Sequence, residues 1–516
     1  MFKRILFVTL LIFCITLGQM EVVSNSYKYQ NAAIFEQSAA PWLYALSQKY
    51  GTKITFANIP DAEINFIVDF KFDLLYLLGV WQKGEIGPNL DRNNPDILED
   101  CHKLMDNCNP KVDIIGSPFS IVEFVVAEEF GGNEGLAVLR QQLKRHGVGL
   151  MLDYVPNHTA LDSPNVEACP ECYIRCPEGW DCDPEVYYKN GIAFGSSGKG
   201  DHWRDVAQLN YWEPKTMHYS INNMLAAASM CDALRVDMAM VVMNDNFENS
   251  WKPQLDAWGY SRPTQEFWSY AIKQVKAKFG TYIIGEQYWH SEGPLQNLGF
   301  DALYDKENLL DDLKSLNVRS VSSYVGWRKR WMVHMVKFLG NHDEPTIWEE
   351  FHHNFQISKA AGMIAFTLPG PRFFWAGQMT GQKTRLKVQF LRRHLNPVDS
   401  DLFGFYQRLA NVYAHPTLNQ DPEYWTWIPT SNNNVVAWVW SSKVTKKNVL
   451  VVVNYSGNDN QWESIKLDYK PDHAGGAAVE FKELISGTTY SRNIDDLRST
   501  GLHVGLSKWT GQIFEF

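Results

Sequence analysis

The stretch Asp232-Ala233-Leu234-Arg235-Val236-Asp237 surrounds an arginine with apolar residues and ends on an acid. It predicts a short buried strand that ends at Asp237. Side chains two residues apart on a strand share a face, so Arg235 and Asp237 should enter one pocket together. The guanidinium would keep the carboxylate ionised, which is the state that a nucleophile needs. A structural ion pair has the same pattern, so the rest of the chain has to decide between the two interpretations.

Apolar runs of this kind recur along the chain and alternate with helical patterns. Eight segments are strand candidates: 72–81, 113–116, 148–155, 232–237, 281–286, 300–304, 332–339 and 372–376. Helical spacing of apolar residues separates several of them, over 135–146, 213–229, 264–279 and 355–368. Strands that alternate with helices predict an α/β protein with a parallel sheet, most economically a (β/α)8 TIM barrel. We expect residues 21–51 to form a leading segment with some helix.

Two segments depart from this alternation. The long stretch Thr159–Asn210, rich in Cys, Pro and Gly, predicts an ordered insertion after the third strand. Beyond Asp421, strands with polar turns and no helical pattern predict an antiparallel β domain. The expected division is a signal peptide at 1–20, a catalytic barrel at 21–158 and 211–415, an insertion subdomain at 159–210 and a C-terminal β-sandwich at 421–516.

The first residues have the pattern of a secretory signal. Met1-Phe2-Lys3-Arg4 places positive charge ahead of the apolar run Ile5–Leu17, which is too short to span a bilayer. We therefore expect a secreted or lumenal protein with no membrane contact once the signal is removed. An uncleaved anchor is the minor alternative.

The cysteines agree with an oxidising compartment. Cys101 and Cys108 are close enough in sequence to pair. Four more cysteines are clustered within the insertion, at positions 169, 172, 176 and 182. Their spacing allows a zinc site, but a secreted chain favours two disulfides. Cys231 is left over and is expected to be a buried free thiol.

Composition limits the range of partners. The 516 residues are 45% apolar and 21% charged, as in an ordinary globular protein. A formal net charge of −10 without long charge runs indicates no nucleic-acid partner. An aromatic content of 14%, with 19 Trp, suits a cleft that stacks on the flat faces of sugar rings. We expect a monomer that takes a carbohydrate substrate.

Four of the predicted strands end on polar groups. They deliver Asp153 to His158, Arg235 with Asp237, Glu286, and Asn341-His342-Asp343. Active sites of such barrels form at the C-terminal ends of the strands, so these groups should surround one cavity. Three carboxylates there suit glycoside hydrolysis with retention, in which two carboxyl groups about 5–5.5 Å apart act as nucleophile and acid. Asp237 has the adjacent cation and is the predicted nucleophile, while Glu286, after an apolar strand, is the predicted acid.

Four segments carry a resemblance to a known family. They are Leu152–His158 (LDYVPNH), Leu234–Asp237 (LRVD), Ile284–Glu286 (IGE) and Leu339–Asp343 (LGNHD). They resemble the four signature regions of the α-amylase family, glycoside hydrolase family 13, in the family's order. The resemblance implies that the insertion is the family's domain B and the last part its domain C. It implies Asp237 as nucleophile, Glu286 as acid/base and Asp343 as transition-state stabiliser, with three residues contacting the cleaved sugar: His158, Arg235 and His342.

Departures from the family pattern concern the substrate and calcium. Met240-Val241 stands where many starch-degrading members carry Lys-His, and Phe119 stands where many place a sugar-stacking tyrosine. The chain therefore resembles a less-characterised glycosidase branch more than the animal or fungal α-amylases. Asn157 matches a position that often binds calcium. One position does not make a site for an ion that takes 6–8 oxygen ligands, so no metal ligands are predicted and calcium stays open as a cofactor.

Three functions compete at this stage. The first is a secreted retaining hydrolase, of α-amylase or α-glucosidase type, acting on starch-like or malto-oligosaccharide substrates. The second is a transglycosylase or sugar isomerase of the same family, because an acceptor hydroxyl can open the covalent intermediate in place of water. The third is an inactive relative that binds carbohydrate or a protein partner.

Overall fold

The computed structural model describes residues 28–327, 329–467 and 478–516. The predicted signal peptide at 1–20 lies outside the described residues. No helix among the residues described is long and apolar enough to cross a membrane.

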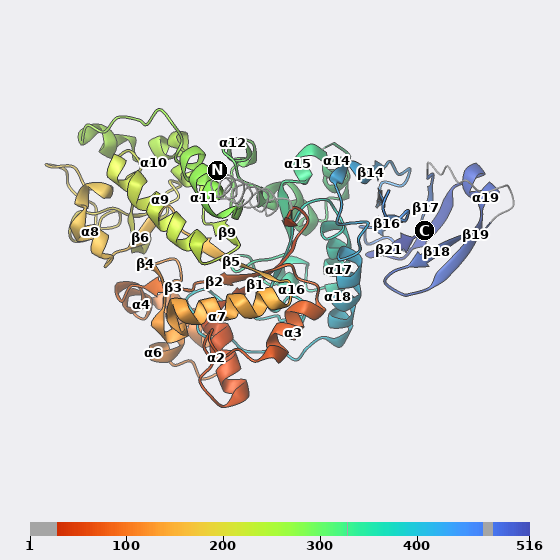
Figure 1. Ribbon diagram of the computed structural model, residues 1–516, viewed down its shortest axis with the longest axis horizontal. Coiled ribbons are helices and arrows are strands. Elements are labelled where there is room, and N and C mark those ends of the chain that lie inside the picture. The colour runs from red at the N-terminus through yellow and green to blue at the C-terminus, as the bar shows by residue number, and fades with distance from the viewer. Residues whose placement is uncertain (1–27, 328, 468–477) are drawn as a thin grey trace, which may run out of the picture.

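Eight parallel strands close into a barrel, in the centre of Figure 1. Neighbours around the barrel follow one another along the chain, and the last strand pairs with the first. The predicted TIM barrel is confirmed. All five residues of β2 (LLYLL) are buried, as expected for a strand covered on both faces. The strands are β1 (Ala33–Ser38), β2 (Leu74–Leu78), β5 (Gly149–Tyr154), β9 (Ala233–Val236), β10 (Tyr282–Gly285), β11 (Ala302–Tyr304), β12 (Met335–Phe338) and β13 (Arg372–Trp375).

Helices connect these strands around the outside of the barrel. The glycines predicted to stop helices do so by adopting the left-handed conformation, as Gly280 does after α11 with φ 63°. The longer connecting helices are α2 (Ala39–Tyr50), α3 (Asp61–Asp69), α7 (Gly132–Arg145), α9 (Pro214–Ser229), α10 (Asn244–Ala257), α11 (Phe267–Phe279), α14 (Val318–Trp327), α17 (Phe355–Ala365) and α18 (Ser400–Tyr413).

One predicted strand was wrong and one was missed. Residues 113–116 form no barrel strand: Asp113 ends the short helix α6 (Pro110–Asp113), and Ile114 makes an isolated bridge to Phe390. The missed strand is β1, whose second half, Glu36-Gln37-Ser38, is polar in sequence. Glu36 is nevertheless fully buried, because it pairs with His342 in the barrel interior. The two errors cancel in the count, so β5 is the third barrel strand.

The segment between β5 and α9 forms a small sheet of its own. Its order is β6 (His158–Ala160), β8 (Trp203–Gln208) and β7 (Phe194–Gly195), next to the short helix α8 (Pro164–Ala168). Both α8 and β6 lie on the left in Figure 1. The structure holds the disulfides Cys169–Cys172 and Cys176–Cys182 in this segment, so the disulfide interpretation is confirmed and the zinc alternative is wrong. Cys101–Cys108 is also bridged, and Cys231 is buried and free, as expected.

A second excursion separates β2 from α7. Its two strands pair antiparallel, and α4 contacts β8 of the insertion. The elements are β3 (Trp81–Lys83), α4 (Ile86–Asp91), α5 (Pro95–Leu104), α6 and β4 (Ile121–Val126).

The C-terminal part is antiparallel β structure, on the right in Figure 1. A six-stranded sheet and a two-stranded sheet enclose an apolar cluster, as predicted for a β domain. Hydrogen bonds fix this part to the barrel: Trp440 Nε1 donates to the Thr367 carbonyl (2.8 Å) and Tyr455 Oη to the Leu313 carbonyl (2.7 Å). The strands are β14 (Trp425–Ile428), β15 (Val435–Ser441), β16 (Asn448–Asn454), β17 (Gln461–Ile465), β18 (Ala478–Glu483), β19 (Thr489–Asn493), β20 (Leu502–Leu506) and β21 (Thr510–Glu515).

Gly149 is a position where the barrel has no room for a side chain. A Cβ atom there would lie 2.4 Å from Tyr29 Oη and 2.8 Å from Leu74 Cδ2. We expect Gly149→Ala to lower the free energy of unfolding by about 1–3 kcal/mol, as overpacked cores do, in a denaturant titration. Gly404→Ala is the control, because this glycine lies inside α18 with only the flexible end of Arg408 nearby. It should raise stability by about 0.5–1 kcal/mol. Equal destabilisation by both changes would contradict the packing argument.

Candidate active site

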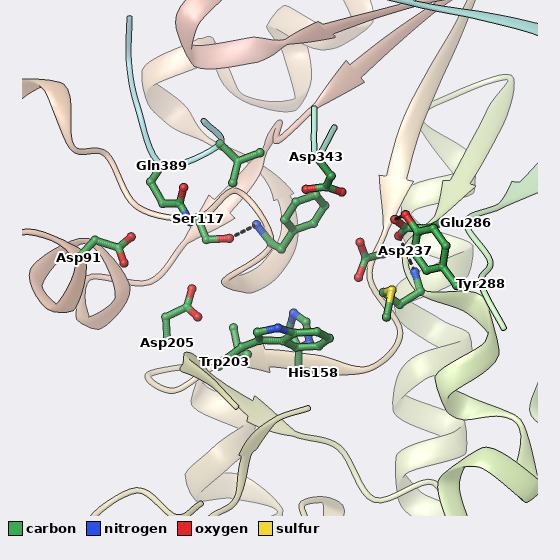
Figure 2. Close-up of a pocket in the computed structure, with 14 residues that line it drawn as sticks. Asp91, Ser117, His158, Trp203, Asp205, Asp237, Glu286, Tyr288, Asp343 and Gln389 are labelled. Atoms are coloured by element: carbon green, nitrogen blue, oxygen red, sulfur yellow. Dashed lines mark hydrogen bonds between the residues drawn. The ribbon is translucent and has the colours of Figure 1, made fainter. Parts of the chain in front are cut away.

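The predicted residues meet at the C-terminal ends of the barrel strands. Asp237 directly follows β9 and Glu286 directly follows β10. Asp343 lies five residues beyond the end of β12, and His158 begins β6, shortly after β5. Asp237, Glu286, Asp343 and His158 line a single cavity of about 390 Å³ (Figure 2). Arg235 and His342 are buried and do not line the cavity, but they pair with the three acids that do.

Arg235 binds three carboxyl groups of the site. It is fully buried, and its Nη1 donates to Asp237 Oδ1 (2.8 Å) and to Asp153 Oδ1 (3.2 Å). Its Nη2 donates to Glu286 Oε2 (2.7 Å). One cation therefore serves three buried carboxyl groups. Burial raises the pKa of Asp237, and the contact with Arg235 offsets this only in part. We expected the guanidinium to hold Asp237 ionised. It is shared with Asp153 and Glu286, and on balance the pKa of Asp237 is raised.

Asp153 is a structural partner of Arg235. Its Oδ1 accepts a hydrogen bond from Tyr76 Oη (2.6 Å), and burial raises its pKa. The Asp153 carbonyl accepts from Trp81 Nε1 (3.0 Å). These bonds hold the guanidinium of Arg235 in place from below.

Glu286 is a buried carboxyl group that accepts hydrogen bonds from three donors, one of them Arg235. It is 2% exposed, and burial raises its pKa; Arg235 lowers it, while the nearby Asp237 and Asp343 raise it further. The backbone N–H of Met238 donates to Glu286 Oε2 (2.9 Å), and Tyr288 Oη donates to Oε1 (2.7 Å). Both carboxyl oxygens are thereby fixed in direction.

The pKa of Asp343 is shifted in the opposite direction to that of Glu286. Enclosure in the cavity raises its pKa, but the His342 imidazole outweighs this and lowers the pKa to about 2. His342 Nε2 lies 3.0 Å from Asp343 Oδ2, and its Nδ1 lies 2.6 Å from Glu36 Oε1. Burial lowers the pKa of His342, yet the two carboxylates raise it well above its usual value. The pKa values of His342 and Asp343 are thus shifted in opposite directions, which favours an ion pair between them at the cavity.

His158 contributes a neutral ring to the cavity wall. Burial lowers its pKa to about 3, so it carries no charge at neutral pH. Its ring packs edge-on against Trp203, with ring centroids 5.4 Å apart. Phe119, at the position of the family's stacking tyrosine, also lines the cavity, and its ring lies 5.4 Å from that of His342.

The cavity has a second acidic end that sequence reasoning missed. Asp91 and Asp205 lie at the left of Figure 2, away from Asp237 and Glu286. Burial raises the pKa of Asp91 to about 7, with a further contribution from Asp205. Burial raises the pKa of Asp205 itself to about 6. Neither acid ends a barrel strand, because Asp91 comes from α4 and Asp205 from β8. No strand-end signal could have pointed to them.

Other residues of the site were also unpredicted. Glu36 sits in the missed strand β1, Tyr288 follows Glu286 by two residues, and Trp203 comes from the insertion. Tyr288 could have been found, because a side chain two positions beyond Glu286 can return to the same face. Glu36 and Trp203 had no local signal, since only the closed barrel and the folded insertion bring them to the cavity.

Three potential metal ligands come together in the segments after β10 and β11: His290, Glu292 and Glu307. The Glu307 carboxylate there instead accepts the backbone N–H groups of Trp289 (2.9 Å) and His290 (2.8 Å). At the calcium position implied by the family resemblance, Asn157 Oδ1 accepts a hydrogen bond from Gln208 Nε2 (2.8 Å). The Asn157 oxygen is thus engaged by an amide donor, which does not fit a calcium ligand.

Known proteins resemble this chain more in fold than in sequence. No family model matches the chain. Alpha-amylase 3 of Dictyoglomus thermophilum is 23% identical over 302 residues, which are 54% of this chain and 56% of that protein. The chain thus spans about half the length of this curated relative.

Two solved structures resemble the chain over almost its whole length. An α-amylase from Lactobacillus plantarum has a TM-score of 0.66 at 18% identity, covering 96% of this chain and 100% of that one. A maltogenic α-amylase from Thermotoga neapolitana has a TM-score of 0.65 at 16% identity, covering 94% and 99%.

The fold and the cavity define a barrel protein with a carboxylate-lined site at the ends of its strands. More particularly, the chain has the fold of the α-amylases, and the resemblance predicted from its four signature segments is confirmed at that level.

Proposed function

We propose that this protein is a secreted retaining glycoside hydrolase that cleaves α-glucosidic bonds in starch-like or malto-oligosaccharide substrates. One observation carries the proposal. Asp237 and Glu286 are bonded to neighbouring nitrogens of one buried guanidinium, and both line a cavity that Asp343 also enters. Two carboxyl groups bridged in this way are close neighbours, which favours the short separation of a retaining enzyme over the wider one of an inverting enzyme.

The reaction would proceed in two displacements. Asp237 attacks the anomeric carbon while Glu286 gives its proton to the glycosidic oxygen, so the C–O bond to the leaving sugar breaks as the bond to Asp237 forms. Glu286, now ionised, then removes a proton from water, whose oxygen displaces Asp237 from the anomeric carbon. The raised pKa of Glu286 suits an acid that must hold its proton until the first step.

The remaining residues would stabilise the charged transition state. The anion Asp343 faces the cavity and favours positive charge developing on the sugar ring. His342, held by Glu36, lies beside Asp343 and fixes its direction. The neutral His158, on the opposite wall, can donate to a sugar hydroxyl. Trp203 and Phe119 offer flat apolar faces to sugar rings.

Secretion is proposed from the cysteines. Three disulfides in the described residues suit an oxidising compartment, where such bonds persist.

A product profile tests this function. Purified protein is incubated with soluble starch, maltose, maltotriose, sucrose and trehalose, and the products are separated while their anomeric form is followed by NMR. We expect glucose or short malto-oligosaccharides from starch or the maltose series, released first as the α-anomer. Release of the β-anomer would contradict retention. New disaccharides without net hydrolysis would assign the protein to the transferases, and no turnover of any of these sugars would contradict the substrate.

A further inference from the structure

A buried amide group joins the insertion to the barrel behind the active site. Gln208, the last residue of β8, is fully buried. Three oxygen atoms converge on its Nε2: Asn157 Oδ1 at 2.8 Å, the Asn157 carbonyl at 3.0 Å and the Leu209 carbonyl at 3.2 Å. We call these three atoms the oxygen cradle.

The orientation of the two amides is fixed by the backbone of Ser196. The Ser196 N–H donates to Gln208 Oε1 (3.1 Å), and the Ser196 carbonyl accepts from Asn157 Nδ2 (3.1 Å). Reversing either amide would place like groups against each other. The nitrogen of Gln208 is therefore the group that faces the oxygen cradle.

Converging buried oxygens need either a hydrogen-bond donor or a cation between them. Carbonyl and carboxamide oxygens are typical calcium ligands, at 2.3–2.6 Å in proteins generally. Here the distances are those of N–H···O hydrogen bonds, and the positive centre is the NH₂ group of a neutral side chain. Asn157 immediately precedes His158, so this junction fixes one wall of the cavity.

We propose that the Gln208 amide takes the place of a calcium ion at the junction of barrel and insertion, so that the wall carrying His158 is held without metal. The oxygen cradle is a latent cation site, and the identity of residue 208 decides its occupant. A carboxylate one carbon shorter than glutamine would leave space beside the three oxygens and supply the negative charge that attracts a divalent cation.

Thermal unfolding of the full-length protein in chelator and in about 10 mM calcium chloride tests this inference. It needs no substrate, so its result is independent of the proposed function. The wild-type melting temperature should differ by less than about 1 °C between the two conditions, because a ligand that does not bind the folded state does not stabilise it. Metal analysis after gel filtration should find no calcium retained.

Three variants at this position separate charge from size. Gln208→Asp should melt at a temperature at least about 2 °C higher in calcium than in chelator, as expected for a newly bound ion. Gln208→Asn is the matched control, equally short but uncharged, and should not respond. Gln208→Glu places an oxygen where the nitrogen stood, against the oxygen cradle, and should melt lower than wild type in both conditions.

Two results would overturn the inference. One is a wild-type protein whose melting temperature falls in chelator and recovers with calcium. The other is a Gln208→Asp variant that folds but responds to calcium no more than Gln208→Asn. If that variant does not fold, the wild-type measurement and its calcium content still decide.

Discussion

Replacing Asp237 by asparagine is expected to lower kcat/KM on malto-oligosaccharides by on the order of 10⁴-fold or more, as loss of a covalent nucleophile does in other hydrolases. The amide keeps the size of the side chain but cannot form the glycosyl ester. Folding should be preserved, because the carbonyl oxygen of asparagine can still accept from Arg235 Nη1, the donor that Asp237 uses. The measurement is steady-state kinetics on maltotriose, with circular dichroism to confirm the fold.

Asp232→Asn is the matched control for this change. Asp232 precedes the same strand, but its carboxylate bonds Arg140 (2.8 Å) and the Leu150 N–H (2.9 Å), away from the cavity. We expect this variant to lose some stability and to keep its kcat. If the Asp237→Asn protein retains more than about a tenth of wild-type activity, Asp237 is not the nucleophile.

Azide identifies the role of Asp237 more directly. In Asp237→Gly the small anion can enter the space that the carboxylate leaves and attack the anomeric carbon from that side. Starting from an activated α-glucosyl donor, the product should be the β-glucosyl azide, since one displacement inverts the carbon. An α-azide would mean that another residue is the nucleophile.

The sequence predicted the three acids of the cavity because the signal for each of them is local. Each acid follows an apolar strand, and the barrel geometry then brings strand ends together wherever the strands lie in sequence. Asp237, Glu286 and Asp343 were placed correctly at one cavity for this reason. Their catalytic roles remain predictions, because position alone does not show chemistry.

What was missed depends on tertiary structure. Strand β1 looked polar because Glu36 belongs to the site and not to a surface, and its partner His342 is 306 residues away. Asp91 and Asp205 come from two excursions that meet only in the folded protein, where α4 contacts β8. The pKa of Asp237 could not be predicted from the neighbouring Arg235 alone. The same guanidinium also donates to Asp153 and Glu286, and only the folded structure brings these groups together.

Removal of the Glu286 carboxyl group is expected to affect activity in a way that depends on the leaving group. Glu286→Ala should lower kcat/KM on maltotriose by about 10²–10⁴-fold, the usual contribution of a general acid. A donor with a very good leaving group, such as α-glucosyl fluoride, needs no proton in the first step and should lose much less in the formation of the covalent intermediate. Azide should then accelerate turnover and give the α-glucosyl azide, because two inversions restore the configuration.

The pH dependence of activity tests the assignment of Glu286 as the general acid. Glu286 acts as an acid only while protonated, so wild-type activity should fall as pH rises through its pKa, which burial holds above the usual value of a glutamate. Activity should also fall as pH drops through the pKa of Asp237, which attacks only when ionised. In Glu286→Ala the alkaline limb of the profile should vanish while the acidic limb stays. An unchanged alkaline limb would show that another group delivers the proton, and Tyr288, whose hydroxyl already bonds Glu286, would be the next residue to test.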